Sequence, residues 1–494
     1  MKKRCLLFFL LALAPLCISS IFLMLESQAQ SLLTVMPEWN DEDFYFNQIK
    51  SMLTYGHPLG YYGYDGSHAM VGNFGAHGFI CMVPYAIFCK IFGLHLNSIT
   101  LLNNIFLCID ILLYEFLFKP SIKKILLFIT LISSPMVIFY TNTSMMEAEH
   151  YFFAITIALE MVYMIENKDN KKTKTLLIFS VIYAVLCRIT WSVLFFPMIL
   201  ILLKNTKAVS KIAKCILAGI GSIIGCIVCY MISRVFTAPY FPGIYIIDEY
   251  IDLLKTGITF SKVRGLIEET YDGVVSALGH FDVMWVNVSR DYIIVVIILT
   301  LLFLLLNRKK EMAYIPAVVL LGFFIGIFAL YYGEGIAIRH IYPAALFAVV
   351  YMFASLNSGK MRYAIYAVSS IMFICTFVLQ INHEYAGRNC WNTEERQKFY
   401  SDIQSHMDVI QISENEETPW DNTLGISLKN SIDRIYELFV PAGTGINYYM
   451  DFPEKNGEMP RYFMISNNEE DIKALINLGY KKIDEFEEIL IFEK

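Results

Sequence analysis

The sequence predicts an α-helical membrane protein with many transmembrane helices, followed by a small α/β domain. Of its 494 residues, 56% are hydrophobic and only 17% are charged, whereas soluble domains average about 25% charged residues. The apolar residues gather in eleven long runs, and the last part of the chain is acidic and polar. This composition excludes a cytosolic enzyme, a disordered chain and a nucleic-acid-binding domain.

Each apolar run is long enough, or nearly long enough, to cross a bilayer as a helix, which takes about 20 residues. The first run follows Met1-Lys2-Lys3-Arg4 and is not followed by a clear small-residue cleavage site. We therefore expect an uncleaved first helix, with a cleaved signal peptide as the alternative. The runs cover residues 5–25, 98–118, 125–141, 148–165, 175–187, 190–203, 212–235, 292–306, 313–332, 341–356 and 363–380.

Lys and Arg residues predict the orientation, since cytoplasmic loops are enriched in them. With the N-terminus inside, 19 of the 28 basic residues before residue 381 fall at the inner face. The C-terminus is then outside the cell membrane. The same rule decides how many times each of two ambiguous segments crosses the membrane. Residues 79–92 form a juxtamembrane or re-entrant helix, and residues 175–203 form two short helices that meet near Arg188.

The outer face carries the long connections. The predicted membrane domain covers residues 1–380, with a first outer loop at 26–97 and a large outer loop at 236–291. All nine His residues lie at this face, so we expect any chemistry there.

Residues 381–494 are predicted to form an extracytoplasmic α/β domain, with 22 acidic and 11 basic residues. Its last part predicts a strand at 461–465, a helix at 469–478 and a strand at 489–492.

Three consecutive carboxylates, Asp41, Glu42 and Asp43, follow the first helix. Crowded like charges and partial loss of water raise the pKa of such a group, which suits it to act as a base. The alternative is that these acids only cap the amphipathic helix expected at 44–53.

The first outer loop then alternates Gly and Tyr, and includes His57, Tyr62 and His77. Tyr rings offer flat faces on which sugars stack, so these three residues are candidates for substrate binding. An ordinary loop at the membrane interface is the alternative.

Three further groups of polar residues lie at the outer ends of helices. Glu147 and Glu149 open the helix expected at 148–165, where the helix dipole alone would explain one acid. Arg188 and Arg339-His340 are the other two groups. Arginine can hold a phosphate through two parallel hydrogen bonds, or simply extend to lipid headgroups.

Several short motifs occur in a particular order along the chain. They are Asp41-Glu42 with Tyr45, a Gly-His-Pro loop at 56–58, Gly75-Ala76-His77-Gly78, Ser134-Pro135 followed by Glu147, and Arg339-His340 with Pro343. This order resembles the GT-C class of membrane glycosyltransferases, near the protein-mannosyltransferase and aminoarabinose-transferase-like families. The resemblance spans the whole chain and implies a GT-C-like fold of about eleven transmembrane helices.

The resemblance also implies an activity. The chain would be an inverting glycosyltransferase that moves a hexose or pentose from a polyprenyl-phosphate donor to an extracytoplasmic glycan, lipid or protein. Asp41 would be the base, although the choice among Asp41, Glu42 and Asp43 stays open. Glu42 or Glu147 would orient hydroxyl groups, and Arg339, together with Arg188, would stabilise the leaving phosphate.

Two other functions stay open, a transporter or flippase and a polymerase or ligase of lipid-linked glycans. The chain shows no repeated halves, which are typical of transporters. The resemblance requires no cofactor, while the clustered carboxylates allow a divalent cation. Richness in Lys, Ile and Asn favours a bacterial origin.

Overall fold

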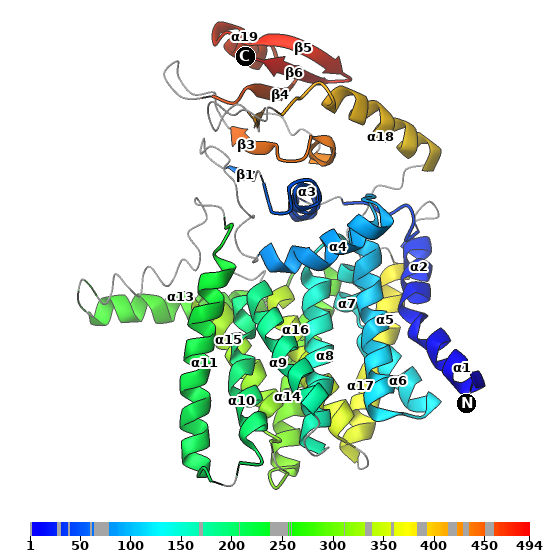
Figure 1. Ribbon diagram of the computed structural model, residues 1–494, viewed down its shortest axis with the longest axis vertical. Coiled ribbons are helices and arrows are strands. Elements are labelled where there is room, and N and C mark those ends of the chain that lie inside the picture. Colours follow the sequence, from blue (N-terminus) through cyan, green and yellow to red (C-terminus); the bar gives the residue numbers. More distant parts are fainter. Residues whose placement is uncertain are drawn as a thin grey trace.

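The chain folds into a helical bundle with a small sheet at one end (Figure 1), as given by a computed structural model. The structure describes residues 2–26, 31–37, 40–59, 62–63, 79–166, 171–206, 208–237, 255, 257, 259–310, 312–330, 338–356, 360–382, 393–412, 422–427, 434–449 and 459–494.

Within these residues, seven helices are long and apolar enough to span a membrane, or eight if a bent pair is counted as one span. Helices satisfy their own backbone hydrogen bonds, which a bilayer core demands. The first span consists of α1 (Lys2–Ala12) and α2 (Ala14–Glu26). The others are α5 (Ser98–Phe118), α8 (Glu147–Glu166), α11 (Lys211–Ser233), α14 (Met284–Leu306), α16 (Ile338–Ser355) and α17 (Lys360–Ile381).

The remaining apolar runs form bent or shorter helices. The bent pair is α6 (Ile122–Ile132) and α7 (Pro135–Thr141), which meet at 76° because Pro135 starts a new helix. The shorter helices are α9 (Lys171–Cys187), η2 (Ile189–Leu194) with α10 (Phe195–Leu203), and α15 (Ile315–Leu330). Within the described residues, each of the eleven predicted runs is mostly helical. The predicted class, a polytopic helical membrane protein with a small C-terminal α/β unit, is confirmed.

The structure also agrees with the predictions for the two ambiguous segments, residues 175–203 and 79–92. The chain breaks at Arg188, whose extended backbone joins α9 to η2. Residues 79–92 form η1 (Phe79–Met82) and α4 (Val83–Phe92), which lie across the end of the bundle (Figure 1). Helix α14 differs most from its predicted bounds, because it starts at Met284 rather than at 292 and so includes the polar residues Asn287, Ser289, Arg290 and Asp291. Residues 236–291, which are predicted to form a large outer loop, contain a further helix, α13 (Phe260–Leu278).

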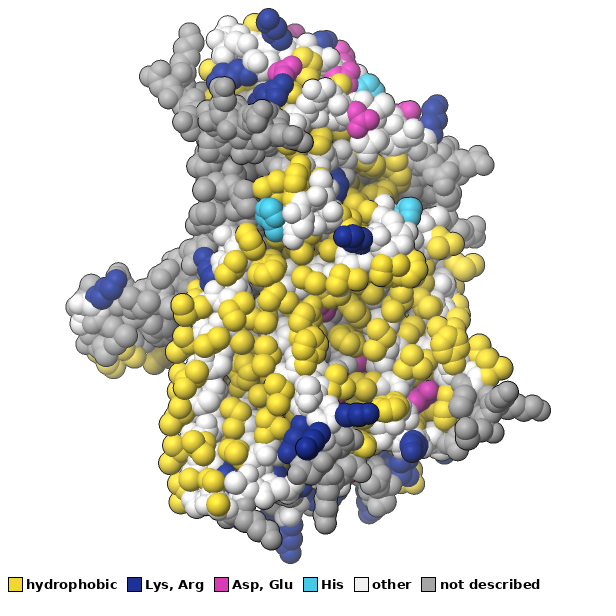
Figure 2. Space-filling model, viewed as in Figure 1, with side chains coloured by type: hydrophobic (Ala, Val, Ile, Leu, Met, Phe, Trp, Pro, Cys, Tyr) yellow, Lys and Arg dark blue, Asp and Glu magenta, His cyan; other side chains and the backbone are white. Residues whose placement is uncertain are grey.

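Helices α8 and α16 form the centre of the bundle. Their apolar stretches are 83% and 89% buried, against 11% for α11 at the periphery. Lys and Arg side chains gather at the end of the bundle away from the sheet, while apolar side chains cover its flank (Figure 2). This charge distribution fits the predicted inner face.

The C-terminal unit is a six-stranded sheet with strand order β1-β3-β2-β4-β6-β5. The strands are β1 (Tyr62–Gly63), β2 (Thr423–Ser427), β3 (Gly445–Tyr449), β4 (Tyr462–Ser466), β5 (Lys481–Phe486) and β6 (Ile489–Glu493). The predicted strand–helix–strand order is confirmed, with α19 (Glu469–Asn477) capped by Asn468. Strand β1 comes from the first outer loop and pairs in parallel with β3. The domain boundary at residue 380 stays a prediction.

Helix α3 (Asn40–Tyr55) lies between the bundle and the C-terminal unit (Figure 1). Its Tyr45 and Ile49 belong to the hydrophobic core of the bundle, whereas Phe44 belongs to the core beneath the sheet. Successive helical residues point in different directions, so one helix serves both layers. This arrangement places the acidic start of α3 over the ends of α8 and α16.

Candidate functional site

The guanidinium of Arg339 lies between two carboxylates from different elements. Its Nη2 atom is 3.6 Å from Oδ2 of Asp41 on α3, and its Nε atom is 3.6 Å from Oε1 of Glu147 on α8. Arg339 occupies the first turn of α16, so three elements that are distant in sequence meet here. The structure thus brings together Asp41, Glu147 and Arg339, three of the residues singled out from the sequence.

The two carboxylates differ in exposure. The side chain of Asp41 is 25% exposed, and that of Glu147 is 1% exposed. The second oxygen of Glu147 has no hydrogen-bond partner within the described part of the chain. Solvent or a ligand can therefore reach Asp41, whereas Glu147 serves Arg339 from inside.

Burial is the main influence on Asp41. It raises the pKa of the Asp41 carboxyl above 3.8, while the Arg339 guanidinium acts in the opposite direction, and Glu147 and Glu42 raise the pKa further. A carboxylate with a raised pKa is a better proton acceptor than an ordinary surface Asp.

Glu42 has a different environment from Asp41, although the two are adjacent. It is fully buried, and its Oε1 atom accepts a hydrogen bond from the backbone N–H of Ser144. This bond holds the turn that leads into α8 and Glu147. The contact assigns Glu42 a structural task.

Two amide side chains of α5 also hold the turn before α8, and neither was predicted from the sequence. Asn103 donates from Nδ2 to the carbonyls of Thr143 and Met145 at 2.9 and 3.1 Å, and accepts from the Tyr85 hydroxyl at 2.7 Å. Asn104 donates to the carbonyl of Thr141 at 2.9 Å. Two adjacent amides inside an apolar run were the signal, since buried amides require partners.

Two tyrosines complete the surroundings of Arg339. Tyr140 on α7 is buried and lies near enough to Arg339 for the guanidinium charge to act on its hydroxyl. Tyr45 on α3 is buried, and the pKa of its hydroxyl is raised by burial and by the charge of Asp41. Tyr45 belongs to the sequence resemblance, whereas Tyr140 was not predicted.

His340 lies behind Arg339 and links it to Arg188. Arg339 Nε donates to His340 Nε2 at 3.2 Å, and Nη2 of Arg188 contacts His340 Nδ1. A neutral imidazole has one unprotonated nitrogen, so it can accept from only one arginine at a time. Arg188 and His340 are 5% and 2% exposed, so they sit behind the accessible groups.

Glu149 lies apart from this group. It is fully buried, and the Cys187 thiol is 4.0 Å from its Oε1 atom. The neighbouring His150 accepts a hydrogen bond from Trp191 at 3.3 Å. These contacts hold α8 against the end of α9 and against η2, and both Glu149 and His150 are buried from solvent.

Of the three loop candidates, only the His57 side chain lies within the described structure, and its printed contacts are not with Arg339. His57 contacts the Tyr55 carbonyl at 3.1 Å and stacks on Phe236, with ring centroids 5.4 Å apart. Tyr62 pairs through its backbone with Ile446, and its side chain lies outside the described atoms. His77 lies outside the described residues.

No group of three or more His, Cys, Asp or Glu side chains that could hold a metal ion occurs among the described residues. At the Arg339 site, the cation between Asp41 and Glu147 is a guanidinium. The chemistry available there is proton transfer at Asp41 and binding of an anion at Arg339.

Comparison by sequence gave no match, either to protein families or to curated proteins. Comparison of structures gave several likenesses, two of which cover nearly the whole chain. ArnT from Cupriavidus metallidurans bound to undecaprenyl phosphate has a TM-score of 0.56 at 12% identity, covering 100% of this chain and 98% of that one. The apo state of the same protein has a TM-score of 0.50 at 10% identity, covering 99% and 98%.

A third likeness is weaker. The oligosaccharyltransferase of Archaeoglobus fulgidus, in complex with Zn and sulfate, has a TM-score of 0.46 at 11% identity, covering 92% of this chain and 68% of that one. The chain therefore shares its overall fold with ArnT along its whole length.

Proposed function

We propose that this chain, which has the GT-C fold, is a membrane glycosyltransferase that uses a polyprenyl-phosphate-linked sugar. Its acceptor would be a glycan, lipid or protein outside the cytoplasm of a bacterial cell. The observation that carries the proposal is the pairing of Asp41 with Arg339, each about a quarter exposed. The undecaprenyl phosphate bound to the similar ArnT supports the class of donor.

The two exposed groups suit the two halves of an inverting displacement. The Asp41 carboxylate takes the proton of an acceptor hydroxyl while the acceptor oxygen forms a bond to the anomeric carbon. The bond from that carbon to the phosphate oxygen breaks on the opposite side, and its electron pair leaves with the phosphate. Arg339 then binds the phosphate, where negative charge increases in the transition state.

The buried residues keep these two groups in place. Glu147 holds Arg339 from below, and Glu42 fixes the turn from which Glu147 extends. A phosphate at Arg339 would compete with Asp41 for the guanidinium. Donor binding therefore leaves Asp41 with less compensating charge, which raises its affinity for the proton of the acceptor.

The charge distribution supports an extracytoplasmic site. The basic residues gather at the end of the bundle opposite the sheet (Figure 2), and cytoplasmic ends of membrane proteins are rich in Lys and Arg. The Asp41–Arg339 pair then faces the outer side, together with the C-terminal unit.

Sugar transfer by the purified protein in liposomes tests the proposal. A radiolabelled polyprenyl-phosphate sugar is supplied with membrane extract as acceptor, and the wild type is compared with Asp41→Asn. Transfer by the wild type and its loss in a folded Asp41→Asn protein support the proposal. Undiminished transfer by Asp41→Asn would exclude Asp41 as the base.

The same assay separates the alternatives. Movement of the labelled lipid across the bilayer without a new product would indicate a flippase. Products that carry long chains in place of one sugar would indicate a polymerase or ligase. Comparison of envelope glycans between a deletion strain and its parent then identifies the sugar.

A further inference from the structure

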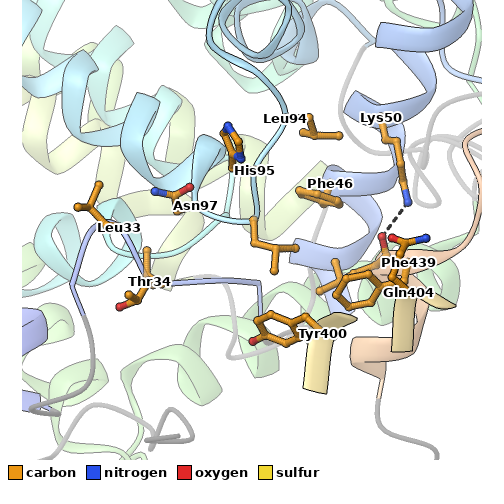
Figure 3. A pocket seen from close by; sticks show the side chains of 13 residues that line it. Leu33, Thr34, Phe46, Lys50, Leu94, His95, Asn97, Tyr400, Gln404 and Phe439 are labelled. Atoms are coloured by element: carbon orange, nitrogen blue, oxygen red, sulfur yellow. Dashed lines mark hydrogen bonds between the residues drawn. The ribbon is translucent and has the colours of Figure 1, made fainter. Parts of the chain in front are cut away.

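A cavity lies on the side of α3 that carries Phe46 and Lys50, and neither Asp41 nor Arg339 lines it. It encloses about 560 Å³, which falls within the usual range for ligand pockets, roughly 300–1,000 Å³. Phe46 and Lys50 line it from α3, opposite Tyr400 and Gln404 of α18 (Thr393–Met407) and Phe439 of η4 (Arg434–Phe439) (Figure 3). The segments 33–35 and 94–97 close its other sides.

Lys50 is a cation with no carboxylate partner among the described residues. Its Nζ atom donates to the carbonyl oxygens of Leu438 and Val440 at 2.7 and 2.6 Å, and it lies 5.8 Å from the centre of the Phe46 ring. It forms no ion pair with any carboxylate of the described chain. Burial lowers the pKa of Lys50 to about 7. An ammonium group has three N–H donors, so one remains after the two carbonyls are served.

The lining of the cavity favours an anion over a cation. None of its described lining residues is acidic, and His95 is the second residue there that can carry positive charge. A buried charge is costly unless an opposite charge accompanies it. A negatively charged group beside Lys50 would supply that compensation.

Apart from Lys50 and His95, the lining is mostly apolar, with Thr34, Asn97 and Gln404 as its uncharged polar members. Leu94 and Leu96 line the cavity beside Leu33, whose side chain is 79% exposed. Ile91 and Phe92, at the end of α4, are 68% and 65% exposed. An apolar surface of this kind, next to a helix that lies across the end of a membrane bundle, suits acyl chains.

We propose that this cavity binds the headgroup of an anionic membrane lipid, with the phosphate at Lys50 and the apolar part of the lipid against Leu33, Leu94 and Leu96. The site lies apart from the Asp41–Arg339 pair and does not depend on glycosyl transfer. Its occupant would link α3, α18 and η4, because residues from all three line the cavity.

Thermal unfolding of the full-length protein in a non-ionic detergent tests the proposal, at about pH 6 so that Lys50 is charged. The probes are short-chain phosphatidylglycerol, phosphatidylcholine with the same acyl chains, and inorganic phosphate. We expect phosphatidylglycerol alone to raise the midpoint of unfolding. Equal stabilisation by phosphatidylcholine, or by inorganic phosphate, would overturn the assignment to an anionic lipid.

Variants then locate the binding. Lys50→Gln should weaken the apparent affinity for phosphatidylglycerol about tenfold or more, a loss of one charged contact, whereas Lys50→Arg should retain it. Lys90→Gln is the matched control, because Lys90 is an exposed lysine on α4 outside the cavity. Affinity of Lys50→Gln within about twofold of the wild type would overturn the proposal.

A second variant covers the case in which Lys50→Gln does not fold. Leu94→Trp fills the cavity and leaves Lys50 in place, so the stabilisation by phosphatidylglycerol should disappear. Its persistence would place the lipid elsewhere. Asp41→Asn should bind phosphatidylglycerol as the wild type does, which keeps this test separate from that of the proposed sugar transfer.

Discussion

Arg339 pairs with two carboxylates at the same distance, and burial should decide which pair contributes more to stability. Both distances are 3.6 Å, but Glu147 is 1% exposed and Asp41 is 25% exposed. Removing one partner of a buried pair costs about 3–5 kcal/mol, because the other charge is left without compensation. Exposed pairs contribute about 0–1 kcal/mol. We therefore expect a coupling energy of about 3 kcal/mol for Arg339 with Glu147 and of about 1 kcal/mol or less for Arg339 with Asp41.

Two double-mutant cycles measure these energies. One cycle combines Arg339→Gln with Glu147→Gln, and the other combines Arg339→Gln with Asp41→Asn. The free energy of unfolding is obtained from titration with sodium dodecyl sulfate in mixed micelles. Glu147→Gln should largely rescue the stability that Arg339→Gln loses, and Asp41→Asn should not.

A pair in the sheet serves as the exposed control. Arg461 and Glu493 lie 2.7 Å apart and are 35% and 33% exposed, so their coupling should be about 1 kcal/mol or less. Equal couplings in the two Arg339 cycles, or a larger one with Asp41, would refute the argument that burial separates a structural acid from an accessible one.

Further predictions concern the base and the turn before α8. Asp41→Asn should reduce transfer by roughly 10²–10⁴-fold, the usual contribution of a general base, with an unchanged gel-filtration profile. The kcat/KM of the wild type should fall as pH falls through the pKa of Asp41, because protonation removes the base. Burial raises that pKa above 3.8, so a pH profile with its acid limb below 3.8 would contradict the assignment. Glu42→Gln keeps an acceptor for the Ser144 N–H and should retain transfer, whereas Glu42→Ala should lower stability by about 1–3 kcal/mol in the same unfolding titration. Asn103→Leu removes three hydrogen bonds and should cost about 1 kcal/mol for each; a stability equal to that of the wild type would show that the turn does not depend on α5.

The sequence predicted the helices well because the bilayer leaves few alternatives. An apolar run must satisfy its backbone hydrogen bonds internally, so each of the eleven runs is mostly helical within the described residues. The break at Arg188 was located from the distribution of Lys and Arg, whereas the bend at Pro135 was not predicted, since residues 125–141 were expected to form one helix.

The roles of the acids could not be separated from the sequence alone. Asp41 and Glu42 are adjacent and chemically alike, yet one faces solvent and the other the Ser144 N–H. The difference follows from the rotation between successive residues of α3 and from the position of the turn before α8, which is a tertiary feature. Strand β1 escaped prediction because two residues carry no pattern.

The contacts of α3 with the C-terminal unit determine when, during synthesis, the site can be completed. Asn47, Lys50 and Tyr55 donate to the backbone carbonyls of residues 437–442, and Ser51 accepts from the N–H of Gly443. Those partners are made by the ribosome after every membrane helix. A nascent chain can thus insert its whole bundle while α3, with Asp41 in its first turn, still lacks its upper attachments. Residues 437–443, which are synthesised after the described membrane helices, complete the support of α3.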